Sequence, residues 1–182
     1  MRLFPALTAP VVPILLTLAA ALALAGCNAD PNEEAMQCPL LYRLPDASRL
    51  ARYDGRGTDI SNLILSVRLA DAKGACSGRL GAQQEGAHVH AVMIVTRGPA
   101  ARSAEADIPY KIGVLHEGAI ISEKSFVQHV VFPPNVTTLE VTGEEIPMVL
   151  PVGKAVTGPS YHLYLWLQLS PAELQANRRN PQ

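Results

Sequence analysis

The sequence predicts an all-β protein: an antiparallel β-sandwich, with immunoglobulin-like topology, that ends in a short helix. Three observations favour this fold class. Apolar residues alternate with polar ones or form short runs, and glycine and proline separate these segments. The strand–helix–strand rhythm of nucleotide-binding α/β folds is absent. A small β-barrel is the alternative.

Seven or eight short strands are expected. The clearest covers residues 161–169, where Tyr161 and the leucines at every second position face one way and the residues between them face the other. A turn signal at residues 116–118 separates two further strands. The other candidate strands are residues 60–69, 89–96, 110–114, 119–122, 126–132, 136–141 and 146–150, with shorter ones at 40–44 and 49–53.

The residues after 169 predict a short helix. Ser170 offers an N-cap hydroxyl, Pro171 suits the first helical position, and Glu173 completes a capping box with Ser170. Two arginines at the far end suit the helix dipole. We expect this helix to dock on a sheet edge through Leu174.

Residues 1–26 have the pattern of a secretory signal peptide. Arg2 provides a positive start, and residues 11–24 form an apolar run of 14 residues without a charge. A transmembrane helix needs roughly 20 such residues. The early prolines also oppose a membrane-spanning helix.

The segment Leu24-Ala25-Gly26-Cys27 resembles a bacterial lipobox. The resemblance implies a diacylglycerol on the Cys27 sulfur and an acylated amine, which together make an effectively permanent anchor. An ordinary signal peptide is the alternative. Asn28, where an aspartate commonly retains such proteins at the inner membrane, implies an outer-membrane location facing the periplasm.

The chain after the signal is expected to hold one domain. Residues 27–37 comprise the lipidated cysteine and a polar tether that reaches at most roughly 33 Å. Residues 38–182 form the β-sandwich. Cys38 and Cys76 are an even pair in an oxidising compartment, which favours a structural disulfide. A metal or redox site is the alternative, although the chain has no CxxC motif.

The charge of the chain argues against nucleic acid as a partner. Arg2 is the only charged residue before Cys27, so the remaining 156 residues carry 14 basic and 16 acidic side chains, a net charge of −2. A nucleic-acid-binding domain would carry a basic stripe.

Short motifs resemble a family of small uncharacterised bacterial lipoproteins. They are Cys38-Pro39, the segments 46–50 (DASRL), 96–101 (TRGPAA) and 168–174 (QLSPAEL), and Asn177-Arg178. The motifs span nearly the whole domain. The resemblance implies the envelope location and the single-domain layout. It implies no activity and assigns no site residue, because that family has no established activity.

His88 and His90 are the candidate metal ligands. Residues two apart in a strand face the same side, so both rings are able to approach one ion, with His116, His129 or His162 as a third ligand. The alternative, which we favour, is that both are solvated histidines at the start of a strand. We expect neither a metal nor another cofactor. Motifs of nucleophilic catalysis are also absent.

Tyr164 and Trp166 share the side of the last strand opposite the leucines. If that side is open, it offers two side chains that often anchor interfaces; if a loop or the final helix covers it, the rings are structural. We expect a membrane-anchored, non-enzymatic binding or structural module whose partner is an envelope protein or a cell-wall component. The alternative is an enzyme or a metal-binding periplasmic protein with a site built from scattered residues.

Overall fold

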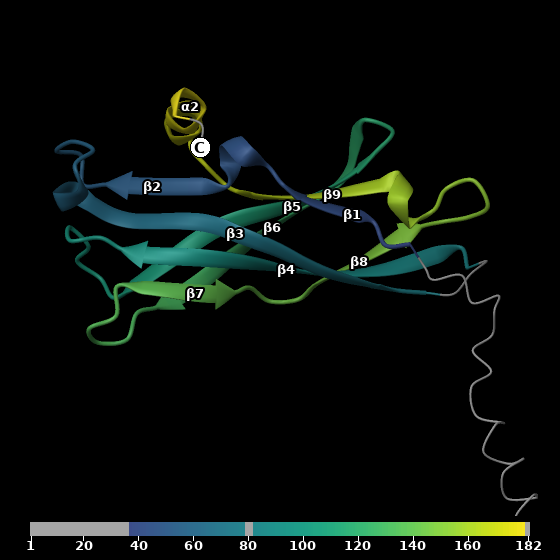
Figure 1. Ribbon diagram of the computed structural model, residues 1–182, viewed down its shortest axis with the longest axis horizontal. Coiled ribbons are helices and arrows are strands. Elements are labelled where there is room, and N and C mark those ends of the chain that lie inside the picture. The colour runs from purple at the N-terminus through teal and green to yellow at the C-terminus, as the bar shows by residue number, and fades with distance from the viewer. Residues whose placement is uncertain (1–36, 79–81, 181–182) are drawn as a thin grey trace, which may run out of the picture. The chain divides into compact units, whose positions relative to one another are not determined.

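The computed structural model describes residues 37–78 and 82–180 (Figure 1). The expected signal peptide, Cys27 and most of the tether lie outside the described residues. The described residues contain no helix that is long and apolar enough to cross a membrane. All of the structure reported below belongs to one compact unit.

The described part of the chain folds into nine strands, three short 3₁₀ turns and one α-helix, α2 (Pro171–Arg179). The 3₁₀ turns are η1 (Pro45–Ala47), η2 (Ile60–Asn62) and η3 (Gly158–Ser160). The strands are β1 (Leu40–Arg43), β2 (Arg49–Tyr53), β3 (Leu63–Ser77), β4 (Gln84–Arg97), β5 (Glu105–His116), β6 (Ala119–Val131), β7 (Thr138–Thr142), β8 (Ile146–Pro151) and β9 (Tyr161–Leu167).

The strands form two sheets. One has the order β1-β9-β5-β6, and the other has the order β2-β3-β4-β7, with β8 also paired to β4. Every pairing is antiparallel except that of β1 with β9, which is parallel. In Figure 1, β5 and β6 pass behind β3 and β4 and cross them at an angle. The sheets do not close into a barrel, so the predicted β-sandwich is confirmed.

The connections between the sheets follow a Greek-key pattern of the immunoglobulin type. After the β3–β4 hairpin the chain crosses to β5 and β6, and it then returns to pair β7 and β8 with β4. Strand β9 crosses again and pairs with β5. The pairing of β4 with β7 and β8 corresponds to that of strands B and E in the immunoglobulin order, and the pairing of β5 with β9 corresponds to that of strands C and F. In this chain β9 lies between β5 and β1.

The core lies between the inner faces of the two sheets. The alternation predicted for the last strand is present, because Tyr161, Leu163, Leu165 and Leu167 are buried and the residues between them are half-buried. Strand β4 supplies a second row of buried side chains, comprising Ala87, Val89, Ala91, Met93 and Val95. The alternation in both strands therefore places one row of side chains in the core and leaves the other row on the outer face.

Several strands differ in extent from the prediction. Strand β4 begins at Gln84 and not at residue 89, and β5 begins at Glu105 and not at residue 110. The strand expected at residues 60–69 begins at Leu63, because the preceding residues form η2, and it continues to Ser77 through an exposed polar half. The segments 119–122 and 126–132 belong to a single strand, β6. As an edge strand, β6 is exposed along most of its length, so the polar residues between the two apolar segments are tolerated. The expected turn between β5 and β6 is confirmed, with positive φ at Glu117 and Gly118.

Helix α2 has the predicted capping box. The Ser170 hydroxyl accepts a hydrogen bond from the Glu173 amide, and the Glu173 carboxylate accepts one from the Ser170 amide. The helix packs against η1 and the edge strand β2. Leu174 is half-buried, and polar contacts from Asn177 and Arg178 to the η1 loop add to the docking.

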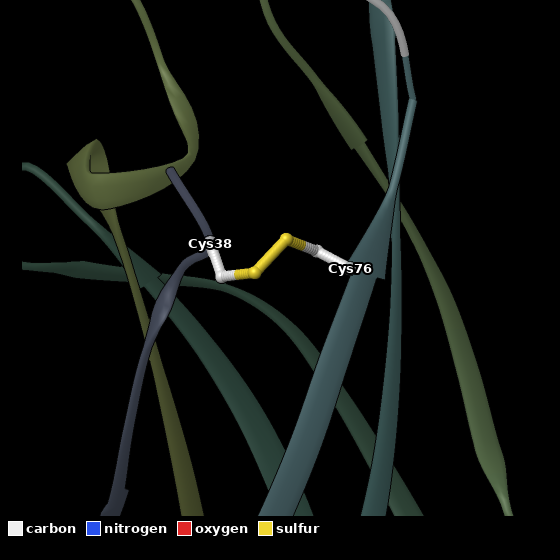
Figure 2. Close-up of a disulfide and its surroundings, with 2 residues drawn as sticks. All are labelled: Cys38 and Cys76. Carbon is white, nitrogen blue, oxygen red and sulfur yellow. A yellow bond between two sulfur atoms is a disulfide. The ribbon is translucent and has the colours of Figure 1, made fainter. Parts of the chain in front are cut away.

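A disulfide joins Cys38 and Cys76, whose Cα atoms lie 5.5 Å apart (Figure 2). Cys38 precedes β1 in one sheet, and Cys76 lies near the end of β3 in the other. The predicted cysteine pair therefore links the two sheets covalently.

Candidate functional site

The outer face of β9 carries an aromatic cluster. Since the odd-numbered residues of β9 are buried, His162, Tyr164 and Trp166 point to the opposite side of the sheet. The parallel pairing with β1 places Tyr42 directly beside Tyr164. We call these four residues, Tyr42, His162, Tyr164 and Trp166, the aromatic face.

Tyr42 holds the aromatic face together. Its ring stacks on Tyr164, with ring centroids 5.3 Å apart and an angle of 24° between the planes. The Tyr42 ring also packs edge-on against the His162 ring, with ring centroids 5.6 Å apart. Tyr42 is 41% exposed, and Tyr164 and Trp166 are half-buried. The alternation in the last strand predicts Tyr164 and Trp166 but not Tyr42, because only the pairing of the first strand with the last brings Tyr42 to this face.

Trp166 lies across the neighbouring strand β5. A Cβ atom added at Gly113 would lie 2.8 Å from Cη2 of Trp166, so the indole ring rests on the bare backbone of this glycine. Lys111, opposite Trp166, places its ammonium 2.6 Å from the Glu123 carboxylate. One face of the Trp166 ring therefore packs against Gly113 and contributes to the packing of β9 on β5. Helix α2, one of the two covers considered for this side, packs against η1 and β2.

His88 and His90 lie on the outer face of β4 and share one carboxylate. Nδ1 of His88 is 3.0 Å from Glu145, and Nε2 of His90 is 3.6 Å from the same side chain. Nδ1 of His90 is also 3.2 Å from the Gly143 carbonyl, which accepts a hydrogen bond from it when Nδ1 carries the proton. Both side chains are partly solvated.

The three other histidines do not join this pair. His116 and His162 belong to β5 and β9, and His129 belongs to β6, all in the opposite sheet. Over residues 37–78 and 82–180, no three histidine, cysteine or acidic side chains are grouped so as to hold a metal ion.

His129 and Asp107 form an exposed pair on β5 and β6. Nδ1 of His129 lies 2.8 Å from the Asp107 carboxylate, and this hydrogen bond raises the pKa of His129. An aspartate that orients a histidine is one part of a hydrolytic triad. Within the described residues, however, no serine, threonine or cysteine side chain is hydrogen-bonded to a histidine ring.

A surface pocket of about 710 Å³ lies between β2, β3 and the start of α2. Its lining includes Arg52, Ile64, Leu169 and Glu173. The charged groups of this pocket, Arg52 and Glu173, face each other at 3.7 Å. No histidine in the described residues lines this pocket.

Comparisons of the chain with protein-family models, with curated proteins and with solved structures find no match.

Proposed function

We propose that this protein is a lipid-anchored component of a bacterial envelope whose β-sandwich binds another envelope molecule through the aromatic face. The anchor is supported by the lipobox-like segment that ends at Cys27 and by the apolar run before it. The outer membrane, with the domain facing the periplasm, is the proposed location, supported by Asn28.

The aromatic face is the observation that carries the binding role. Tyr and Trp side chains supply much of the energy at protein interfaces when they gather near the centre of a patch. Here Tyr42 and Tyr164 are stacked, and Trp166 is fixed on Gly113, so little conformational entropy is lost when a partner covers them. The neighbouring Lys111 and Glu123 neutralise each other.

The tether strengthens this proposal by restricting where the domain meets a partner. About ten residues separate Cys27 from the domain. At no more than roughly 3.3 Å per residue, the domain stays within a few tens of ångströms of the lipid. Partners confined to the same layer are encountered at high effective concentration, so a small patch is sufficient for binding.

Crosslinking in intact cells tests the proposed function. The wild-type protein should form a crosslink with a membrane-proximal protein or a cell-wall component. Tyr42→Ala should reduce this product several-fold, because it removes the most exposed ring of the aromatic face without opening the core. Trp166→Ala should act in the same direction. Tyr53→Ala, the same change on β2 in the other sheet, is the matched control and should leave the product unchanged.

The same experiment contains an arm for the anchor. Cys27→Ser should give a protein that carries no lipid, leaves the membrane fraction and loses the crosslink. Wild-type protein whose mass shows no lipid would contradict the anchor. Equal crosslinking by wild type and Tyr42→Ala would contradict the binding role of the aromatic face, provided that thermal melts show both proteins folded.

A further inference from the structure

A second surface pocket, of about 560 Å³, lies where β1 approaches β3 beside η1. Three arginines from three different strands line it: Arg43 from β1, Arg49 from β2 and Arg68 from β3. One acidic side chain, Asp71, shares the lining. Figure 1 shows η1 between β1 and β2, with α2 close to it.

Arg49 and Arg68 are directly opposite each other in the antiparallel pairing of β2 with β3. Residues in such positions have Cβ atoms about 5 Å apart, and two like charges there destabilise the sheet. In the part of the chain that the structure describes, the Arg68 side chain makes no hydrogen bond or ion pair, and the Arg49 side chain donates only to the Asn180 carbonyl. Neither guanidinium is therefore neutralised by a carboxylate.

Arg43 is held in place by neutral acceptors. Its Nη1 donates to the Leu69 carbonyl at 2.9 Å and to the Ala70 carbonyl at 2.6 Å. These carbonyls lie at the irregularity where the pairing of β3 with β4 shifts register between Leu69 and Asp71. The contacts fix the guanidinium without cancelling its charge, and its remaining N–H groups stay free to donate.

The acidic residue of the pocket does not balance the three cations. One oxygen of Asp71 accepts a hydrogen bond from the Ala72 amide, and the side chain is exposed. Counting the four charged groups of the lining gives an excess of two positive charges. Asp46, on the adjacent η1 turn, is engaged by Arg178 at 3.1 Å.

We propose that this pocket binds a phosphate group. Guanidinium groups are planar donors that match the geometry of phosphate oxygens, and hydrogen bonds between charged partners are about twice as strong as neutral ones. A tetrahedral oxyanion has several oxygens, which can bind cations on different sides. Here the three arginines come from three strands, β1, β2 and β3. A bound anion would also relieve the repulsion between Arg49 and Arg68. The pocket borders the aromatic face, because Tyr42 also lines it. The phosphate proposal is carried by the three arginines and does not depend on the proposed function.

Titration calorimetry on the purified full-length protein at low salt tests this proposal. Inorganic phosphate and glycerophosphoglycerol, the deacylated headgroup of phosphatidylglycerol, are the probes, and sodium acetate is the carboxylate control. We expect saturable binding of at least one phosphate probe, weakened about tenfold by Arg68→Gln and by Arg49→Gln. Arg102→Gln, an exposed arginine outside the pocket, should leave binding unchanged. Tighter binding of inorganic phosphate indicates a free phosphate ligand, and tighter binding of the phosphodiester indicates a lipid headgroup.

Arg68→Gln also has a readout that needs no ligand. Because it removes one of two opposed charges, it should raise the melting temperature at low salt, and added phosphate should stabilise the wild type more than the variant. The proposal is wrong if neither phosphate probe binds, if acetate binds equally well, or if Arg68→Gln binds phosphate as the wild type does.

Discussion

Glu85 is the one buried charged residue in the part of the chain that the structure describes. It lies on β4, is 3% exposed, and its Oε1 has no hydrogen-bond partner there. The Glu85 carboxyl group packs against the backbone of Gly158. A Cβ atom added at Gly158 would lie only 2.7 Å and 2.9 Å from the two oxygens of Glu85. Burial away from water disfavours the charged form and raises the pKa of this carboxyl.

This raised pKa predicts a pH-dependent stability. When the folded-state pKa of a carboxyl group is above its unfolded value, the neutral form contributes to the stability of the fold. This contribution is fully present below the unfolded pKa, about 4.3 for glutamate, and it is lost as the pH rises through the folded-state pKa. Glu85→Gln should not lose stability in this way, because the glutamine side chain does not ionise. At neutral pH the variant should be more stable than the wild type by about 1–3 kcal/mol, and at pH 4 the two should be nearly equal.

Urea unfolding between pH 4 and pH 8 measures this difference. Glu140→Gln, on the exposed outer side of β7, is the matched control and should leave the pH profile unchanged. Parallel profiles for wild type and Glu85→Gln would show that Glu85 is solvated in the folded protein.

At the scale of one element, the docking of α2 depends on Asn177. Its Nδ2 donates to the Asp46 carbonyl and to the Arg49 carbonyl, each at 2.8 Å. The Arg49 guanidinium in turn donates to the Asn180 carbonyl at the end of the helix. The side chain of Asn177 therefore connects the helix to the two ends of the η1–β2 junction.

Asn177→Ala should loosen α2 while the sandwich remains folded. The loss of two hydrogen bonds at a partly buried position should cost about 1–2 kcal/mol. Hydrogen exchange should accelerate in residues 171–179 and stay slow in β4 and β9. Gln175→Ala, at an exposed position of the same helix, should change neither quantity. Exchange that is equal in the two variants would contradict this role.

The elements that sequence reasoning predicted best are those fixed by local patterns. The alternation in β9 and the capping box of α2 each depend on residues a few positions apart, and both are confirmed. The apolar pattern predicts two strands where the structure has the single strand β6, because an edge strand needs no continuous apolar row. Tyr42 beside Tyr164 and Arg49 opposite Arg68 result from strand pairing between elements, which no local pattern encodes.

At the scale of the whole molecule, the two sheets are joined through β1. This strand has four residues, pairs in parallel with β9, and contacts the second sheet through Arg43 and through the disulfide beside it. Parallel pairing is slightly weaker per residue than antiparallel pairing. The covalent link therefore has a larger share in holding β1 in place than in holding the long hairpins.

Removal of the Cys38–Cys76 disulfide should destabilise the fold and release β1 first. The bond closes a loop with a sequence separation of 38 residues, for which chain entropy gives about 4 kcal/mol. The double variant Cys38→Ser, Cys76→Ser leaves no unpaired thiol at this site, and its free energy of unfolding should fall by about 2–4 kcal/mol. Hydrogen exchange should rise in residues 40–43 before it rises in β4, since β1 is shorter and lies at the sheet edge. Alkylation of the exported wild-type protein without reduction should leave both cysteines unmodified. Two reactive thiols, or a double variant as stable as the reduced and reoxidised wild type, would show that the link between the sheets does not stabilise the protein.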